Sequence, residues 1–598
     1  MPLDAIGNQK VLPFWVQPPT RSEPDQFELD GLLRCDCYHV PSVESMKEVL
    51  DAYSEFVHPT MPLLDVDELH STITVRPTVA GVAKGTRVSL LLVQALLFAT
   101  SPFLADSTLQ TLGYDSGAAA QRAFYQRAEL LYSHNTEKDP VAILQSLLLM
   151  SYRVRTPDNE KSAIYWSRLA ATHAQTTDIT GMIKRSSEGR YRSLLRRLWW
   201  CCLLRESLVG LGSRLPTILS TDSESPSPLT AEDFPSSTDI NLHSTFAPQN
   251  SGGDVAYTGG VDRSQGRKDI CTIQLITIEL SRLSVWISKL LSIDRSTAAL
   301  VGLVPCISGQ EDQKIDCWRR LVEKTCAAGL KEWLNALPAE ARFSTAEVTG
   351  STPSACVTAN RIMLYMVFQA AASFLYRRQA VHAASLVDSP ITCSPKDPLR
   401  HAARRLRRAA QEIASASKIM IGQGLTKYMQ PHGVSVMLSS ISVLLVDVRD
   451  RSKAANAAVA VRTCLDVLQA MARNHDGVQR VYEAFAPLIE HTFAQLAPRE
   501  HDEDFVHGNG NGEDLHHPFS ATPVPDTQTL DFHDPWNVGW PWDSFQPGEI
   551  HHQNEALLGF DISVGGSNPG QGFENIPDLW FPDDGAEGNL IRHDEFLF

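Results

Sequence analysis

Three potential metal ligands lie within five residues near the start of the sequence: Cys35, Cys37 and His39. A structural zinc site normally takes four ligands, with paired cysteines separated by about two to four residues. Here a single residue separates the cysteines, and no second cluster of ligands follows nearby. We therefore expect ordinary thiols at these positions and no cofactor bound to this chain. Zinc would be present only in a zinc cluster upstream of it.

Possible nucleophiles and bases form no catalytic pattern. The sequence has no nucleophile elbow, zincin helix, dinucleotide fingerprint or P-loop. His58 and His173 lie in apolar stretches, where packed histidines are commoner than catalytic bases. A helical enzyme of the terpene-processing type needs an Asp-Asp-x-x-Asp run in its helices, and Asp583-Asp584 lies outside them. We predict no catalytic residues and no enzymatic activity.

Acidic and aromatic residues alternate in the last part of the chain. Residues 501–598 contain nineteen Asp and Glu, one Arg, and thirteen Phe and Trp. Such a charged segment cannot form a core, and its acids keep the aromatic side chains available to a groove on a partner. This composition is typical of an acidic activation domain. The anchors expected to contact a coactivator are Trp536, Trp540, Trp542, Trp580 and Phe581.

Two other interpretations of this tail remain open. It could fold back on the rest of the chain and inhibit it, or it could be a plain disordered terminus.

The densest basic run, residues 401–410, has four arginines on one side of a helix and the apolar stripe Ala402, Leu406 and Ala410 on the other. It is interpreted as a solvated helix face, with a nuclear-import patch or a docking surface for acidic partners as alternatives.

Composition separates the tail from a folded body. The chain has 598 residues and a formal net charge of −16, and the tail alone accounts for −18. A body so close to neutral does not resemble a dedicated nucleic-acid-binding surface. Eleven cysteines without a framework spacing are typical of reduced intracellular thiols. The most apolar run, residues 88–104, is interrupted by Gln94 and by Ser101-Pro102, so we expect a buried helix and a soluble protein.

Helical periodicity dominates residues 41–497, and no alternating run is long enough for a sheet. The predicted fold is all-α, a set of packed helical hairpins with a disordered acidic tail. Start signals are clear at Pro41-Ser42 and at Asp139-Pro140. The expected parts are an extended lead-in (1–40), a first helical region (41–218), a loop or disordered linker (219–268), a second helical region (269–497) and the tail (498–598). Ser-Pro pairs in the linker could accept phosphate.

The most strongly patterned helix surrounds two adjacent tryptophans. Apolar residues recur at spacings of three and four from Leu194 to Leu211, the stripe of a buried helix. Trp199 and Trp200 project about 100° apart, so the helix should be packed on more than one side. Gly212 is a natural helix stop, and Pro216 prevents continuation.

Three stretches in this order resemble the middle homology region of fungal zinc-cluster transcription factors, in particular the cutinase transcription factor 1-beta type. The first, the His-Pro segment, is Val57–Asp65, with His58, Pro59 and Pro62. The second runs from Arg196 to Pro216 and includes Trp199, Trp200, the pair Arg205-Glu206 and Arg214. The third, the closing segment, is Leu229–Phe234, with Asp233 and Phe234.

The chain departs from that family in three ways. Leu215 stands where the family usually has Arg before the proline, and Glu206 stands where it usually has Asp. The family's six-cysteine zinc cluster is not found in this sequence. DNA binding would then come from a zinc-cluster partner or from missing upstream sequence.

The resemblance implies a nuclear transcriptional regulator of a metabolic or secondary-metabolite gene set. Its helical region would be regulatory and its tail would recruit coactivators or the transcription machinery. Partners would include a zinc-cluster protein or a second copy of this chain, with no membrane involved. The alternative is a ligand-binding or scaffold module without direct transcriptional activity.

Overall fold

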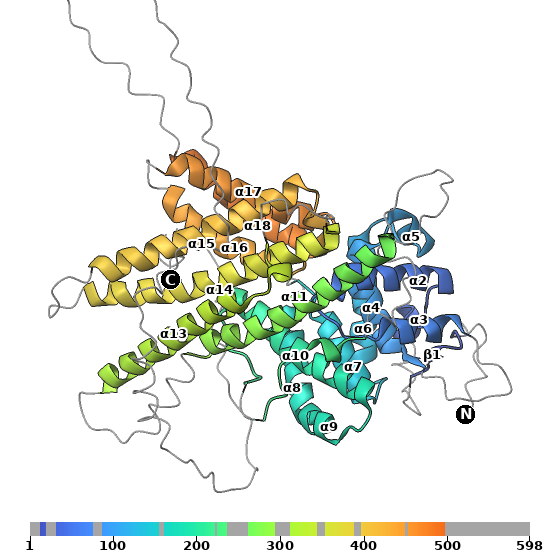
Figure 1. Ribbon diagram of the computed structural model, residues 1–598. Helices are drawn as coiled ribbons and strands as arrows, with labels where there is room; N and C mark the ends of the chain where they lie inside the picture. The colour runs from blue at the N-terminus through green and yellow to red at the C-terminus, as the bar shows by residue number, and fades with distance from the viewer. Residues whose placement is uncertain are drawn as a thin grey trace, which may run out of the picture. The chain divides into compact units, whose positions relative to one another are not determined.

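The computed structural model describes ten stretches of the chain (Figure 1). They are residues 12–19, 31–75, 87–154, 161–221, 224–235, 261–293, 311–343, 353–387, 396–448 and 453–496. All of them belong to one compact unit. The whole predicted tail lies outside the described residues, including Trp536, Trp540, Trp542, Trp580 and Phe581.

The described residues form an all-α fold, which confirms the predicted class. The first group, here called the N-terminal helices, is α2 (Val43–Ala52), the π-helical turn η2 (Tyr53–Val57), α3 (Val66–Thr74), α4 (Leu90–Thr100), η3 (Ser101–Phe103), α5 (Asp106–Thr111), α6 (Gly117–Ser133), α7 (Pro140–Met150), α8 (Ala163–Thr176), α9 (Ile179–Arg185), α10 (Gly189–Ser213) and η4 (Ala231–Asp233). The C-terminal helices are α11 (Val261–Leu291), α13 (Glu311–Ala336), η5 (Ala339–Ala341), α14 (Ala355–Val387), α15 (Lys396–Gly422), η6 (Thr426–Tyr428), α16 (Gly433–Val448), α17 (Ala454–Ala472) and α18 (Val478–Leu496).

Helices adjacent in sequence pack together as hairpins. Helix α14 packs against α15, α16 against α17, α17 against α18, and α10 against α11. Helix α4 packs on α6 and α7. Figure 1 shows α14 and α15 lying side by side, with α16 to α18 beyond them. Short connections join the helices of the α14–α15, α16–α17 and α17–α18 pairs and favour antiparallel neighbours, because each helix can bury its apolar stripe against the next one. Helices α10 and α11 instead are separated by residues 214–260.

Helix starts follow the signals in the sequence. The Ser42 side chain accepts a hydrogen bond from the Ser45 amide and caps α2. Asp139 caps α7 by accepting from the amides of Val141 and Ala142, and Pro140 occupies the first turn. Each cap satisfies backbone donors that the helix leaves unpaired.

The lead-in is more ordered than its prolines suggest. Val16–Gln17 forms strand β1, which pairs in parallel with Val88–Ser89, strand β2. Trp15 is 1% exposed, and Leu32 and Cys37 are also buried. The expectation of a merely extended segment therefore fails for part of residues 1–40, because these apolar side chains complete the core of the N-terminal helices.

Two other boundaries differ from expectation. Helix α11 begins at Val261, so the last residues of the expected 219–268 linker are helical. Within α11, Gln265–Leu291 is long and apolar enough to span a membrane. It nevertheless packs against α10, α13 and α14 in the described part of the chain, and 56% of its most apolar window is buried. At the other boundary, Gly212 does not stop α10, because the helix continues to Ser213 and ends with Arg214 in the left-handed region, at φ 56°.

Candidate functional site

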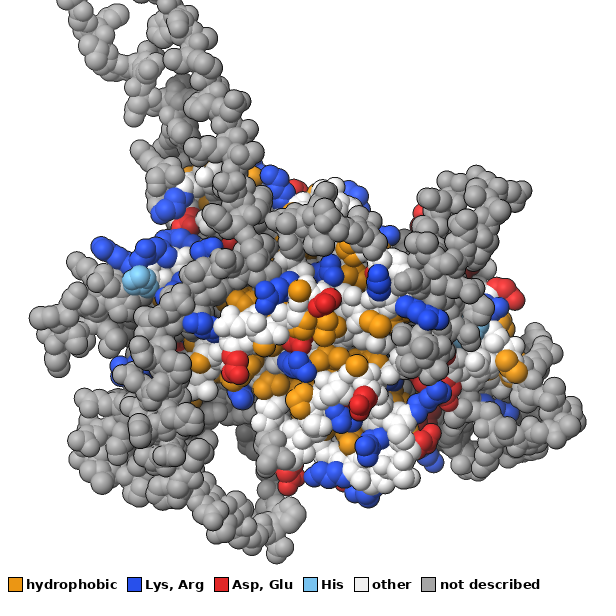
Figure 2. Space-filling model, viewed as in Figure 1, with side chains coloured by type: hydrophobic (Ala, Val, Ile, Leu, Met, Phe, Trp, Pro, Cys, Tyr) orange, Lys and Arg blue, Asp and Glu red, His pale blue; other side chains and the backbone are white. Residues whose placement is uncertain are grey.

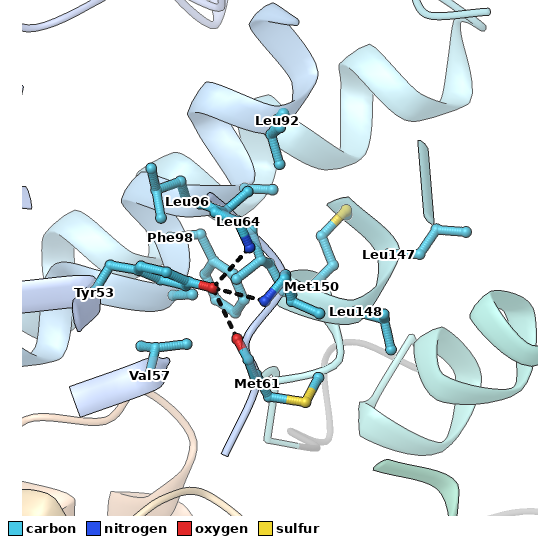
Figure 3. Close-up of a cluster of buried hydrophobic side chains, with 14 of the residues drawn as sticks. Tyr53, Val57, Met61, Leu64, Leu92, Leu96, Phe98, Leu147, Leu148 and Met150 are labelled. Atoms are coloured by element: carbon cyan, nitrogen blue, oxygen red, sulfur yellow. Dashed lines mark hydrogen bonds between the residues drawn. The ribbon is translucent and has the colours of Figure 1, made fainter. Parts of the chain in front are cut away.

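The His-Pro segment is folded around one buried phenol. Tyr53 Oη donates a hydrogen bond to the carbonyl of Met61 (2.8 Å) and accepts from the amides of Leu63 (2.9 Å) and Leu64 (3.3 Å). Figure 3 shows this hydroxyl among apolar side chains, with Val57 on the same segment. Burial raises the pKa of Tyr53 far above its ordinary value. A proline-rich turn thus has its backbone donors satisfied inside the core.

A buried arginine joins this segment to the other two family-like stretches. Arg197 on α10 is 3% exposed. Its Nε donates to the carbonyl of Pro62 (3.1 Å), and its Nη1 donates to the carbonyl of Asp233 (2.7 Å). The Phe234 ring lies beside the guanidinium, 6.0 Å from centroid to Cζ. We call this arrangement the Arg197 junction.

His58 lies beside this junction as a buried side chain. Its Nδ1 is buried and has no hydrogen-bond partner among the described residues, and its ring meets that of Tyr53 edge-on at 5.5 Å. Desolvation, with a smaller effect of Arg197, lowers the pKa of His58 to about 3. The imidazole is therefore neutral at physiological pH. His173 places Nε2 3.0 Å from the carbonyl of Pro140, an equally structural contact.

The closing segment and the residues just before it contact α10 near the tryptophan pair. Arg196 Nε is 2.9 Å from Asp233 Oδ1, and Asp233 Oδ2 accepts from the Thr230 amide (2.9 Å). Trp200 Nε1 donates to the carbonyl of Ser227 (3.1 Å). Trp199 meets Trp200 edge-on at 5.0 Å, and both rings are buried. Trp200 thus contacts the chain just before the closing segment, and Trp199 packs edge-on against Trp200.

The second half of α10 contains another buried charged pair. Arg205 Nε donates to Ser151 Oγ (2.8 Å), and its guanidinium stacks on the Tyr152 ring at 4.9 Å. Burial lowers the pKa of Arg205 to about 10, so it keeps its charge at neutral pH. Glu206 accepts from the amides of Ile218 (3.0 Å) and Leu219 (3.1 Å). The longer Glu side chain, where the family usually has Asp, makes a polar contact with the chain just beyond the turn.

The remaining family-motif residues lie at the C-terminal end of α10. Arg214 caps the helix and is exposed. The carbonyl of Pro216 accepts from Arg168 Nη2 (3.0 Å). The structure therefore brings together His58, Pro62, Asp233 and Phe234 around Arg197. It leaves Pro59, Arg214 and Pro216 outside the junction.

C-terminal helices contact the same His-Pro region. The Tyr428 hydroxyl donates to Glu55 Oε1 (2.5 Å), and Cys356 Sγ donates to the Glu55 carbonyl (3.3 Å). Gln430 Nε2 donates to the carbonyl of Phe56. Thr277 on α11 donates to the carbonyl of Pro59 (2.6 Å). The turn that follows α2 is thus shared by both groups of helices.

One aspartate makes a second connection between the two groups. Asp476, between α17 and α18, pairs with Arg122 (3.0 Å) and with the largely buried Arg153. Its backbone amide donates to Gln121 Oε1 (2.8 Å). Burial opposes ionisation, but the hydrogen bonds from Arg153 and Arg122 prevail and lower the pKa of Asp476. We call these contacts the Asp476 pairs.

Sequence reasoning missed several of these polar residues. Arg197, Cys201 and Arg205 are four residues apart, so both arginines lie on the apolar stripe of α10. An arginine on a buried stripe is the signal that could have identified them, because a buried charge needs partners. No comparable local signal marks Asp476, whose partners lie more than 300 residues away.

The cysteine motif contains no metal centre in the described residues, where no three His, Cys, Asp or Glu side chains gather. Cys35 is exposed, whereas Cys37 is buried and its Sγ lies 4.0 Å from the carbonyl of Arg127. Burial raises the pKa of Cys37 to about 12. This thiol is a packed side chain.

The basic run has the expected amphipathic form. Ala402 and Ala410 on α15 are buried, and Arg404 and Arg408 are exposed. Arg407 pairs with Asp447 at 2.6 Å, and Arg408 lies 3.8 Å from Glu412. Figure 2 shows Lys and Arg side chains gathered at the end of the α14–α15 pair. Part of this charge is used within the fold.

Comparison with known proteins identifies the domain. Residues 50–301 match the fungal specific transcription factor domain. This range contains the His-Pro segment, all of α10 and the closing segment, so it includes the whole Arg197 junction. No solved structure matches the chain.

Curated relatives agree with this match. A transcription factor of Fusarium pseudograminearum is 31% identical over 465 residues, covering 74% of this chain and 48% of the relative. Cutinase transcription factor 1 beta of Fusarium vanettenii is 26% identical over 438 residues, covering 72% and 48%. The fusaric acid cluster transcription factor FUB12 of Fusarium oxysporum f. sp. lycopersici is 23% identical over 199 residues, covering 33% and 28%.

The chain thus spans about half the length of the first two relatives. Family and relatives are named as transcription factors and not as enzymes. The resemblance inferred from the three sequence stretches is confirmed: residues 50–301 of this chain match the fungal specific transcription factor domain, and the relatives it resembles are named as fungal transcription factors.

Proposed function

We propose that this protein regulates transcription in the nucleus, with a helical regulatory region and an acidic activation tail. The match of residues 50–301 to the fungal specific transcription factor domain carries this proposal. DNA binding is supplied by a zinc-cluster partner or by upstream sequence outside this chain. The tail contacts a coactivator or the transcription machinery through its aromatic residues.

The regulated genes belong to a metabolic or secondary-metabolite set. The printed names of two relatives support this choice, since one refers to cutinase and another to a fusaric acid cluster. Within the helical region, the Asp476 pairs and the contacts of Tyr428, Gln430 and Thr277 with the turn after α2 connect the N-terminal and C-terminal helices. A signal received by one group of helices can therefore reach the other through buried polar contacts.

A reporter assay tests the tail. The full chain is fused to a foreign DNA-binding domain, and Trp536, Trp540, Trp542 and Trp580 are changed together to Ala. We expect the reporter signal to fall about tenfold or more, because aromatic anchors dominate the binding energy of such segments. Unchanged reporter activity at equal protein level would contradict the proposed mechanism.

The matched control changes four polar residues of the same tail to Ala: Gln528, Asn537, Gln546 and Asn554. These changes keep every acidic and aromatic residue, so the reporter signal should stay near the parent level. The alternative function, a ligand-binding or scaffold module, predicts that deletion of residues 498–598 leaves expression of the natural target genes unchanged.

A further inference from the structure

Two identical Ser-Pro pairs follow each other in the segment between α10 and α11. They are Ser225-Pro226 and Ser227-Pro228. A proline restricts the residue before it to extended backbone, so alternating prolines keep this stretch extended. An extended Ser-Pro pair is the form that proline-directed kinases take as substrate. By sequence the two serines are equivalent.

The structure separates the two hydroxyls. Ser225 is half-buried, and its Oγ donates to the carbonyl of Ser220 (2.9 Å). Ser227 is exposed, and none of the described hydrogen bonds uses its Oγ. A third Ser-Pro pair in the described residues, Ser101-Pro102, is fully buried at the end of α4. Among these three serines, only Ser227 combines an extended backbone with an accessible hydroxyl.

Ser227 is also held against a basic face of α10. Its carbonyl accepts from Arg196 Nη2 (3.1 Å) and from Trp200 Nε1 (3.1 Å), and the Pro228 carbonyl accepts from the same Arg196 nitrogen (2.8 Å). Arg192 is exposed and lies one turn before Arg196 on the same side of the helix. Glu224 and Glu232 lie on the segment itself and are exposed. Both carry negative charge, as a phosphate does.

We propose that Ser227 is a phosphorylation site for a proline-directed kinase, and that its phosphate is bound by Arg196 and Arg192 on α10. In the transfer, Ser227 Oγ attacks the γ-phosphorus of ATP while its proton passes to the kinase's base. The bond from that phosphorus to the ADP oxygen breaks, and ADP leaves. The new group adds about −1.5 to −2 charges next to the arginines.

The expected consequence is tighter attachment of residues 224–234 to α10. Phosphate oxygens accept strong, charge-assisted hydrogen bonds from guanidinium groups. Arg196 already contacts the backbone of this segment, and Arg192, one turn earlier on the same side of α10, is proposed as the second donor. Glu224, Glu232 and Asp233, whose Oδ1 lies 2.9 Å from Arg196 Nε, weaken this attraction. The two glutamates are exposed, so water screens their charge.

Phosphorylation of the purified full chain tests the site. The chain is incubated with a proline-directed kinase and Mg-ATP, and occupancy at each serine is measured by peptide mass spectrometry. We expect Ser227 to be modified about tenfold more than Ser225, because Ser225 must first give up its hydrogen bond. Ser227→Ala should lower the phosphorylation signal of this peptide about tenfold, and Ser225→Ala should leave it nearly unchanged. Equal or greater modification of Ser225, or no modification of Ser227, overturns the proposal.

Hydrogen exchange tests the arginine contacts. The reference is the Ser227→Ala chain treated with the same kinase, so that phosphates elsewhere are matched. Amides of residues 224–234 should exchange about three- to tenfold more slowly in the phosphorylated parent chain. Arg192→Gln should reduce this protection without affecting modification itself. Unchanged or faster exchange in the parent chain overturns the binding of the phosphate by α10.

Discussion

Single buried arginines organise the region matched by the family. Arg197 takes its partners from backbone carbonyls, at Pro62 and Asp233. Carbonyl dipoles replace the water that a guanidinium loses on burial. Burial lowers the pKa of Arg197, but the ordinary pKa of arginine lies far above neutral pH. The residue therefore stays charged. Its hydrogen bonds hold the His-Pro segment and the closing segment against α10, although neither segment is joined to that helix by regular secondary structure.

Replacing Arg197 tests this role. Arg197→Met keeps much of the side-chain length but leaves the carbonyls of Pro62 and Asp233 without their donor. We expect a loss of about 3 kcal/mol in the free energy of unfolding, the combined cost of two unsatisfied buried acceptors. Urea denaturation followed by circular dichroism measures it. The matched control is Arg192→Met, on the exposed side of the same helix, which should change stability by no more than about 0.5 kcal/mol. Equal effects of the two changes would show that the junction contributes nothing specific.

At the scale of elements, α10 is the helix on which the others assemble. It contacts α7, α8, α9, α11, α14 and α16. Two glycines near its C-terminal end permit close approach. A Cβ at Gly210 would lie 2.5 Å from Leu291 Cδ1 and 2.9 Å from the Leu215 carbonyl oxygen, and one at Gly212 would lie 2.6 Å from Ser435 Cβ. These glycines therefore serve helix packing rather than helix termination.

Adding a methyl group at these contacts should separate the helices. Gly210→Ala is expected to destabilise the protein by about 1 to 3 kcal/mol, since the Leu215 carbonyl is backbone and cannot move away freely. Thermal unfolding monitored by circular dichroism provides the measurement. Gly189→Ala, at the start of the same helix, has nothing within 4 Å of the added Cβ. It should be neutral or slightly stabilising, because Ala favours helix over Gly. A Gly210→Ala protein as stable as the parent would refute the close approach.

For the molecule as a whole, polar contacts between distant parts of the sequence connect the N-terminal and C-terminal helices. The Asp476 pairs link the turn after α17 to α6 and to the end of α7. Gln430 and Tyr428 reach the turn after α2. In both places a loop of the C-terminal helices contacts the N-terminal helices, and these polar contacts add to the packing of α10 against α11, α14 and α16.

A double-mutant cycle measures the Asp476 pairs. Asp476→Ala is combined with Arg153→Ala and, as the matched control, with Arg122→Ala. Arg153 is 8% exposed and Arg122 is 58% exposed. The coupling energy should exceed about 1 kcal/mol for the buried pair and stay below that for the exposed one, which water screens.

The coupling should also depend on pH in one direction. A lowered pKa means that the folded protein favours the charged carboxylate of Asp476. Its stabilising effect is therefore complete above the ordinary Asp pKa of 3.8 and is lost as the pH falls through the lower, folded-state pKa. Coupling that vanishes at pH 7, or that grows on acidification, would exclude the ion pairs as its source.

Local signals in the sequence were sufficient for the fold class, most helices and the family. Hydrophobic spacing identified the buried face of α10, and Ser42 and Asp139 marked helix starts correctly. These features depend on residues within a few turns of one another, where side-chain spacing directly determines which face is buried. The three family-like stretches could be identified for the same reason, since each is a short motif.

Only the tertiary structure decided which residues meet. Arg197 lies 135 residues from Pro62 and 36 from Asp233, and spacing along a chain does not specify which carbonyls a buried arginine will find. The same limit applies to Trp15 and Leu32, which lie in the segment expected to be extended but are buried in the core. It applies also to Ser225 and Ser227, because the sequence does not distinguish the two Ser-Pro pairs. Burial and pairing depend on how whole helices pack, so local sequence determined the elements and tertiary packing determined the site.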